Sequence, residues 1–245
     1  MLHGFTGSIE NWRPLVPHLA DQFTVISADL PGHGKTAAPV DFLRYGIECV
    51  ASDLVELMDS LGHKQFHLLG YSMGGRLALF LAINHVSVIK KLILESASPG
   101  LKTESERKNR LALDNRLADR IEQDGIEDFV GFWESISLWE SQKHLSEDRK
   151  QSLRQIRLAN NPAGLANSLR GMGTGQQPSQ WSQLSDLDAQ TLLITGALDQ
   201  KFCGIAADMK PLIPNCQHQT ILNAGHTIHL EKPAEWLHAI QDFLI

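Results

Sequence analysis

Ser72 lies in a pattern that could make a serine nucleophilic. It is the centre of Gly70-Tyr71-Ser72-Met73-Gly74, which follows the apolar residues 66–69 and precedes a Leu- and Ala-rich stretch over 74–84. The first segment predicts a strand and the second a buried helix. The glycines permit a sharp turn between them, and the hydroxyl would lie near the positive end of the helix. The alternative is a tight turn that carries an ordinary serine.

A nucleophilic serine needs a general base, and the base needs a carboxylate that orients it. Asp199 follows a predicted strand at 191–195, and His226 follows another at 219–222. Because chemistry in parallel α/β sheets gathers at the C-terminal ends of strands, we expect both side chains near Ser72. We interpret His229 as structural, since two histidines without a third ligand make no metal site.

The elements that must position these residues alternate along the chain. Predicted strands lie at 23–29, 66–69, 91–95, 191–195 and 219–222, and predicted helices at 47–61, 74–84 and 233–244. This alternation indicates a parallel α/β sheet. Residues 99–181 differ, because they carry helical stripes and no convincing strand. We therefore expect one core domain, 1–98 and 182–245, with a helical cap inserted at 99–181.

The composition excludes several classes of protein. The 245 residues are 42% hydrophobic and 20% charged, an ordinary globular balance that argues against disorder. The net charge of −6 argues against a nucleic-acid partner but permits a small basic pocket for an anionic ligand. Three cysteines fit no zinc template and predict reduced thiols in a cytoplasmic protein. No apolar run predicts a membrane span, no metal or organic cofactor is indicated, and the oligomeric state stays open.

Several motifs together resemble the α/β-hydrolase family across the whole chain. They are His3-Gly4-Phe5, Asp29-Leu30-Pro31-Gly32-His33-Gly34, Gly70 to Gly75, Asp199 and Ala224-Gly225-His226. The resemblance implies a mostly parallel sheet flanked by helices and a catalytic triad in the order Ser72, Asp199, His226. It also implies an oxyanion hole formed by the backbone N–H groups of Phe5 and Met73. The alternative for His3-Gly4-Phe5 is a plain N-terminal turn.

The start of the chain departs from the family pattern. Relatives normally carry two or three short strands before the His-Gly-Phe loop, whereas Met1 lies almost on that loop here. We therefore expect either a trimmed sheet or a natural chain longer by roughly 15–20 residues, at about five or six per strand. Loss of those strands would expose a sheet edge and loosen the loop that positions Phe5.

More specific strings resemble one branch of the family, a group of lyases in menaquinone and phylloquinone biosynthesis. They are GYSMGGR at 70–76, ESASPGL at 95–101, RGMGTGQQPSQW at 170–181 and NAGHTIHLEKP at 223–233. The resemblance implies elimination of pyruvate from 2-succinyl-5-enolpyruvyl-6-hydroxy-3-cyclohexene-1-carboxylate, without net hydrolysis. It does not distinguish a menaquinone from a phylloquinone as the end product.

Such a substrate carries several carboxylates, which arginine is suited to bind bidentately. Arg76, four residues after Ser72, is costly to bury unless it meets an anion, and the alternative is a salt bridge to a cap carboxylate. By resemblance, Arg110 and Arg157 are further carboxylate-binding candidates, although each alone could be a solvated surface arginine.

Two aromatic side chains complete the expected pocket. Tyr71, beside the nucleophile, and Trp133, in the cap, are expected to line it, although Trp133 could equally be cap core. The family position after this tryptophan can hold a tyrosine, whereas this chain has Glu134, so we expect that contact to be absent.

Two other functions stay open. The same triad could serve a serine hydrolase of small carboxylic esters or of carbon–carbon bonds. The chain could also be a non-catalytic α/β-hydrolase-like binding protein, which a complete Ser/Asp/His set in the right order disfavours.

Overall fold

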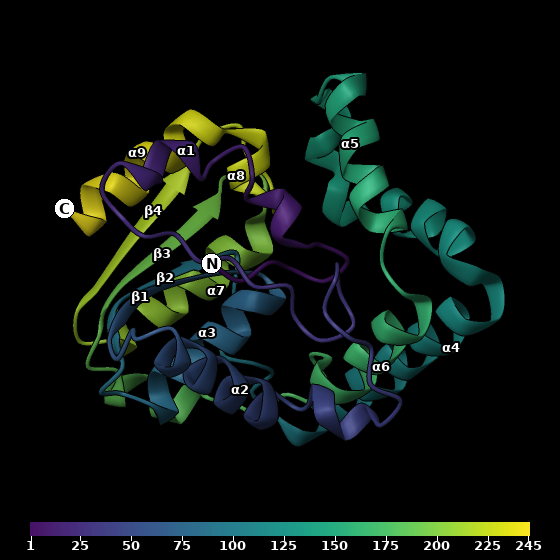
Figure 1. Cartoon of the computed structure of the whole chain (residues 1–245), viewed down its shortest axis with the longest axis horizontal. Helices are drawn as coiled ribbons and strands as arrows, with labels where there is room; N and C mark the ends of the chain where they lie inside the picture. The colour runs from purple at the N-terminus through teal and green to yellow at the C-terminus, as the bar shows by residue number, and fades with distance from the viewer.

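The structure is a computed structural model that describes residues 1–245, and its centre is a four-stranded parallel sheet (Figure 1). The strands lie in the order β1 (Phe66–Tyr71), β2 (Ile89–Glu95), β3 (Gln190–Gly196) and β4 (Cys216–Ile221). All three neighbouring pairs are parallel, so the four C-terminal strand ends share one edge of the sheet. Four of the five predicted strands are thereby confirmed, with β4 beginning three residues earlier than 219.

Helices cover both faces of the sheet, as the predicted fold class requires (Figure 1). One buried cluster lies between the sheet and α2 (Ile47–Ser60), α3 (Met73–Asn84) and α7 (Gln200–Met209). A second cluster packs α1 (Pro17–Ala20) and α9 (Pro233–Leu244) on the opposite face. The predicted helices at 47–61, 74–84 and 233–244 are confirmed. No helix combines the length and apolarity that crossing a membrane requires.

The prediction of a strand at 23–29 is wrong in its extent. Only Ala28 forms a bridge, to Leu2, and Leu2 in turn bridges to Gly70 of β1, both in the parallel sense. The Leu2 N–H donates to Leu69 at 2.9 Å, and the Leu2 carbonyl accepts from Tyr71 at 3.0 Å. The Met1 ammonium also donates to the Ile26 carbonyl at 2.7 Å, and the Ala28 N–H donates to the Met1 carbonyl at 3.4 Å, but these contacts form no ladder.

An apolar cavity of 300 Å³ lies beside this segment. Its lining joins the N-terminal residues to α2, β1 and α9, through side chains such as Met1, Phe23, Leu57, Phe66 and Leu244. No strand precedes β1 in the chain.

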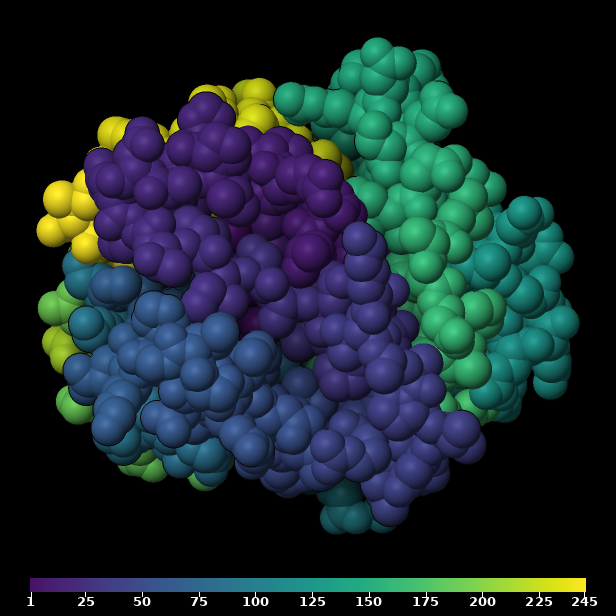
Figure 2. Space-filling view, in the orientation of Figure 1, coloured from purple at the N-terminus to yellow at the C-terminus, as the bar shows by residue number.

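Between β2 and β3 the chain forms only helices. They are α4 (Glu104–Ser135), η3 (Ser137–His144), α5 (Glu147–Leu158), α6 (Pro162–Met172) and η4 (Trp181–Asp186). A kink at Gly125, where φ is +80°, divides α4 into two helical segments. Residues of α4 and α6 share a third buried cluster, which includes Ile121, Phe129 and Leu165. Figure 2 shows this helical part beside the core, with the segment that carries α5 projecting from the molecule.

The remaining elements are short. They are η1 (Ile9–Asn11), η2 (Phe42–Tyr45), η5 (Lys210–Leu212) and α8 (Ile228–Glu231). The last of these directly follows His226 and Thr227, so it fixes the chain that carries the predicted base.

Candidate active site

Ser72 occupies a turn that the backbone holds in an unusual conformation. It joins β1 to α3 with φ +51° and ψ −108°, and its N–H donates to the Glu95 carbonyl at 2.9 Å. A Cβ on Gly74 would lie 2.5 Å from the His3 carbonyl oxygen, so this position excludes any side chain. The strand, glycine turn and helix predicted around Ser72 therefore form a nucleophile elbow.

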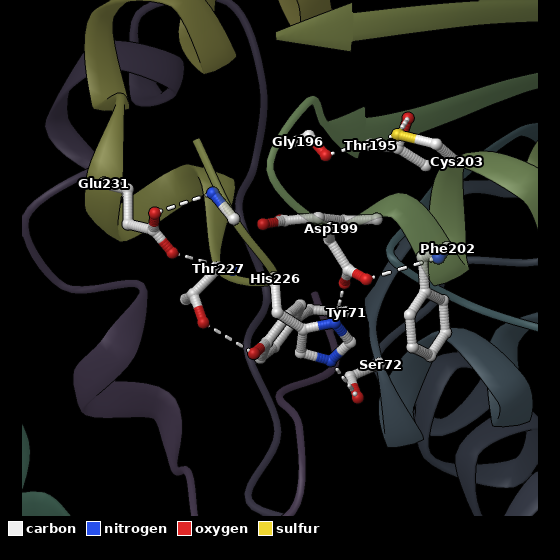
Figure 3. Close-up of polar contacts among 12 residues, drawn as sticks. Tyr71, Ser72, Thr195, Gly196, Asp199, Phe202, Cys203, His226, Thr227 and Glu231 are labelled. Carbon is white, nitrogen blue, oxygen red and sulfur yellow. Dashed lines mark hydrogen bonds and ion pairs between the residues drawn. The ribbon is translucent and has the colours of Figure 1, made fainter. Parts of the chain in front are cut away.

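The structure brings Ser72, His226 and Asp199 together (Figure 3). His226 Nε2 lies 3.0 Å from Ser72 Oγ, and His226 Nδ1 lies 2.7 Å from Asp199 Oδ2. An Nδ1–H that donates to the carboxylate leaves Nε2 free to accept the serine proton. Asp199 Oδ1 also accepts from the Phe202 N–H at 3.2 Å, which fixes the carboxylate at the start of α7. The arrangement can therefore act as a general base through the serine oxygen.

Glu231 fixes the loop that carries the histidine, a role for which the sequence offers no local signal. Its carboxylate accepts from the Gly225 N–H at 2.7 Å and from the Thr227 N–H at 3.2 Å (Figure 3). The Thr227 hydroxyl in turn lies 2.7 Å from the Tyr71 hydroxyl. Burial raises the pKa of Tyr71, so the phenol is neutral at ordinary pH. His226 is thus fixed through both of its chain neighbours.

The predicted oxyanion donors have no acceptor within the protein. Met73 is the first residue of α3, where a helix leaves its N–H groups unpaired, and neither its N–H nor that of Phe5 forms a hydrogen bond. The Gly74 N–H donates to the His3 carbonyl at 3.1 Å, which ties the Phe5 loop to the elbow. Two free N–H groups beside a serine can stabilise a developing negative charge.

The imidazole of His3, at the start of the Phe5 loop, has a structural role. The ring is fully buried, and Nε2 accepts from the Leu30 N–H at 3.0 Å while Nδ1 lies 2.8 Å from the Gly4 carbonyl. Burial lowers the pKa of His3 to about 4 and that of the neighbouring His33 to about 3. Both rings are therefore neutral structural groups, packed with centroids 5.0 Å apart.

A cavity of 430 Å³ contains this chemistry. Eight of the ten predicted site residues line it: Phe5, Tyr71, Ser72, Met73, Arg76, Arg110, Trp133 and His226. Asp199 lies behind His226 and does not reach the cavity, as expected of an orienting carboxylate.

Arg76 is a buried cation without a carboxylate partner. Its side chain belongs to a residue only 8% exposed, and it donates to Gln177 Oε1 at 3.0 Å and to the Met172 carbonyl at 2.9 Å. Both acceptors are neutral. Burial, with a smaller contribution from Arg110, lowers the pKa of Arg76 to about 10, which leaves it charged at neutral pH. The alternative of a salt bridge to a cap carboxylate is wrong.

The two cap arginines differ in their positions. Arg110 lines the cavity and pairs through Nε with Asp114 at 2.7 Å. Arg157 lines a neighbouring cavity and not the one that contains Ser72. It is bound to Glu134 at 3.0 Å and stacks over Trp139 at 5.2 Å. Trp139 lines both this cavity and the neighbouring one, so Arg157 lies against a residue that the two cavities share.

Trp133 has both of the roles considered for it. Its ring packs against Phe129 at 5.8 Å and against Phe5 at 5.5 Å, and it also lines the cavity. Its indole N–H is buried without a partner. Glu134, the next residue, points to Arg154 and Arg157 instead of the cavity.

Two features at the end of β2 lie in the ESASPGL string, which by itself does not indicate their roles. Ser96 has φ +47°, and its buried hydroxyl has no partner although the residue lines the cavity. The fully buried Glu95 carboxylate accepts from His229 Nδ1 at 2.9 Å and from Trp236 Nε1 at 2.8 Å. These contacts agree with a structural His229. No group of three His, Cys, Asp or Glu side chains is arranged to hold a metal ion.

A Ser–His–Asp set at the C-terminal edge of a parallel sheet, with its histidine and aspartate buried and free backbone donors beside it, defines the serine α/β-hydrolase class. The family model for the α/β-hydrolase fold matches residues 1–233, and the chain belongs to this family.

Similar proteins indicate the branch of the family. A Bacillus subtilis (strain 168) protein, named as a candidate 2-succinyl-6-hydroxy-2,4-cyclohexadiene-1-carboxylate (SHCHC) synthase, is 45% identical over 99% of this chain and 88% of its own length. The SHCHC synthase of Enterobacter sp. (strain 638) is 33% identical over 95% of this chain and 86% of its own. The solved structure of MenH from S. aureus is 39% identical, with a TM-score of 0.96, and matches 99% of this chain and 91% of that one. The resemblance to the quinone-pathway lyases is confirmed.

Proposed function

We propose that this chain is an SHCHC synthase, a carbon–oxygen lyase that eliminates pyruvate from 2-succinyl-5-enolpyruvyl-6-hydroxy-3-cyclohexene-1-carboxylate. The observation that carries the proposal is Arg76, a buried and uncompensated cation in the cavity that holds Ser72. A buried charge of this kind calls for an anionic ligand. The substrate is accordingly a small anion with carboxylates, and the route is menaquinone or phylloquinone biosynthesis.

The proposed first step is removal of the ring proton next to the succinyl carbonyl. His226, oriented by Asp199, accepts the Ser72 proton through a contact of 3.0 Å, and the serine oxygen takes the proton from the ring. The electron pair left on the ring delocalises into the carbonyl as an enolate. Ser72 thus acts as part of a base and forms no acyl-enzyme.

The proposed oxyanion donors stabilise that enolate. Phe5 and Met73, whose N–H groups form no hydrogen bond within the protein, both line the cavity that contains Ser72. Donors of this kind typically contribute about 3–4 kcal/mol each to the transition state. Collapse of the enolate through the conjugated ring breaks the carbon–oxygen bond, and the enolpyruvate that leaves takes up a proton to become pyruvate.

The substrate carboxylates are assigned to the cavity cations. Arg76 is the primary contact, and Arg110 is the second, because both line the cavity. Tyr71 and Trp133 provide part of the lining. Arg157 is the third candidate, from the neighbouring cavity, where it pairs with Glu134 and stacks over Trp139.

The helical segment 99–181 is proposed as a cap on a single core domain made of 1–98 and 182–245. Its role is to close the cavity over the substrate, since Arg110, Trp133 and Trp139 all belong to it. Three cysteines without disulfide bonds fit a reducing compartment, and we place the enzyme in the cytoplasm.

The direct test is incubation with the enolpyruvyl substrate while pyruvate release and the conjugated-diene absorbance are followed together. Equal amounts of pyruvate and diene are expected from the wild type and neither from Ser72→Ala. Absence of pyruvate with the wild type would overturn the proposed activity.

The hydrolase alternative predicts a different kinetic signature. A p-nitrophenyl ester would give an acyl-enzyme burst and rapid turnover if Ser72 served mainly as a nucleophile. A non-catalytic binding protein would bind the substrate without releasing either product.

A further inference from the structure

Arg76 has no carboxylate partner, although Asp114 is close enough to act on it electrostatically. Asp114, which acts electrostatically on Arg76, is bonded to Arg110 and to the Gly175 N–H. The two acids that line the cavity are also engaged, Glu106 with the Thr103 N–H and Asp208 with Lys102. Asp114 and both acids that line the cavity are thus directed to other donors, so Arg76 keeps its charge for the cavity.

The group that holds Arg76 instead is the carboxamide of Gln177, which is 1% exposed. Its Oε1 accepts from Arg76 Nη1 at 3.0 Å, and its Nε2 donates to Gln180 Oε1 at 3.3 Å. The second bond sets the direction of the amide, with oxygen toward Arg76. The Gln180 backbone is anchored in turn, since its N–H donates to the Pro99 carbonyl at 2.8 Å.

We propose that Gln177 is a positioning residue that orients the Arg76 guanidinium while leaving its positive charge available to a substrate carboxylate. A carboxamide accepts a hydrogen bond from arginine without cancelling its charge. A carboxylate at the same place would form a buried ion pair with Arg76 and would compete with the substrate. This inference rests on the proposed function, because it takes a carboxylate of the substrate as the ligand of Arg76.

The decisive variant is Gln177→Glu, which keeps the shape of the side chain and adds one negative charge. Its KM is expected to rise by about tenfold to a hundredfold, the value of a charge-assisted hydrogen bond, while kcat changes by less than about threefold. The free energy of unfolding is expected to stay level or to rise. Gln180 Nε2, which has no partner, can turn to donate to the new carboxylate.

A merely structural Gln177 predicts the reverse, a less stable protein with an unchanged KM. The matched control is Gln176→Glu, which makes the same change in net charge at the adjacent, exposed position and is expected to leave KM within about twofold of the wild type. A KM for Gln177→Glu equal to that of Gln176→Glu would overturn the inference.

A binding measurement separates this inference from the proposed activity. In a Ser72→Ala background, quenching of tryptophan fluorescence reports ligand entry, because Trp133 and Trp139 line the cavity. The substrate, and succinate as a simpler dicarboxylate probe, are each titrated with and without Gln177→Glu. Failure of the wild type to release pyruvate would overturn the activity alone. Equal dissociation constants for both anions in the two backgrounds would overturn the role of Gln177.

Discussion

His226 and Asp199 share a hydrogen bond of 2.7 Å between Nδ1 and Oδ2, with both side chains almost completely buried. The carboxylate holds the imidazole in the tautomer whose Nε2 can accept the Ser72 proton. In Asp199→Asn the amide NH2 can favour the opposite tautomer. We expect kcat to fall by about 10³–10⁴ with little change in KM, measured by diene absorbance. A loss of less than tenfold would remove Asp199 from the mechanism.

The backbone at Ser72 stores strain that glycine would release. At φ +51° a residue with a Cβ costs about 1–2 kcal/mol relative to glycine. Ser72→Gly is therefore expected to raise the unfolding temperature by about 2–4 °C while it removes at least about 10³ of the activity. Calorimetry checks the stability and pyruvate release checks the activity. A lowered unfolding temperature would contradict a strained elbow.

Arg76→Met tests how the buried cation affects stability and binding. The change removes a costly buried charge but leaves Gln177 Oε1 and the Met172 carbonyl without their donor. These opposing effects should keep the free energy of unfolding within about 1 kcal/mol of the wild type. KM should rise by about tenfold to a hundredfold. A decrease in the free energy of unfolding of more than about 3 kcal/mol would instead identify Arg76 as a structural residue.

Glu95 makes a different prediction, because its carboxylate is fully buried and accepts from three N–H groups, two of them on His229 and one on Trp236. Glu95→Gln turns one acceptor oxygen into a donor that faces those N–H groups. We expect the free energy of unfolding, measured in urea, to fall by about 2–4 kcal/mol. The exposed Glu56→Gln is the control and should change stability by no more than about 0.5 kcal/mol.

The buried histidines make stability depend on pH. The pKa of His33 is about 3 in the folded protein against 6.5 as its ordinary value, so between these values the unfolded chain binds more protons. The contribution of neutral His33 to the free energy of unfolding is therefore fully present above about pH 6.5, and it is lost as the pH falls toward 3. From pH 7.5 to 4.5, His33 alone should account for about 2–3 kcal/mol of the lost unfolding free energy. In His33→Asn the fall in the free energy of unfolding between these pH values, measured in urea, should be smaller by that amount. An unchanged dependence of the free energy of unfolding on pH would contradict the prediction.

Residues within recognisable local patterns were predictable from sequence. Ser72 was marked by its glycines and by the strand and helix on either side, and the ends of β3 and β4 identified Asp199 and His226. The roles of Gln177, Glu95 and Glu231 depend on contacts made by residues distant in the chain or on details of loop geometry, so periodicity gives no sign of them. The strand expected at 23–29 has the right composition, but only Ala28 within it forms a bridge, to Leu2.

Arg157 shows a second limit of the same kind. Its residue type and position matched the family pattern, yet its direction is decided by Glu134, twenty-three residues earlier in the chain and on another helix. Competition between partners for one guanidinium depends on packing and cannot be read from spacing alone.

Leu2 connects the Phe5 loop to the sheet across a long stretch of chain. Its two backbone hydrogen bonds go to Leu69 and Tyr71, so closing them requires ordering a loop of nearly seventy residues. Local helices such as α3 can form long before such a contact. The order of folding should then place the Phe5 loop, the proposed oxyanion donor, among the last parts to settle. Protection of the Leu2 N–H from hydrogen exchange during refolding would report when this contact forms, and it can be compared with the time at which activity appears.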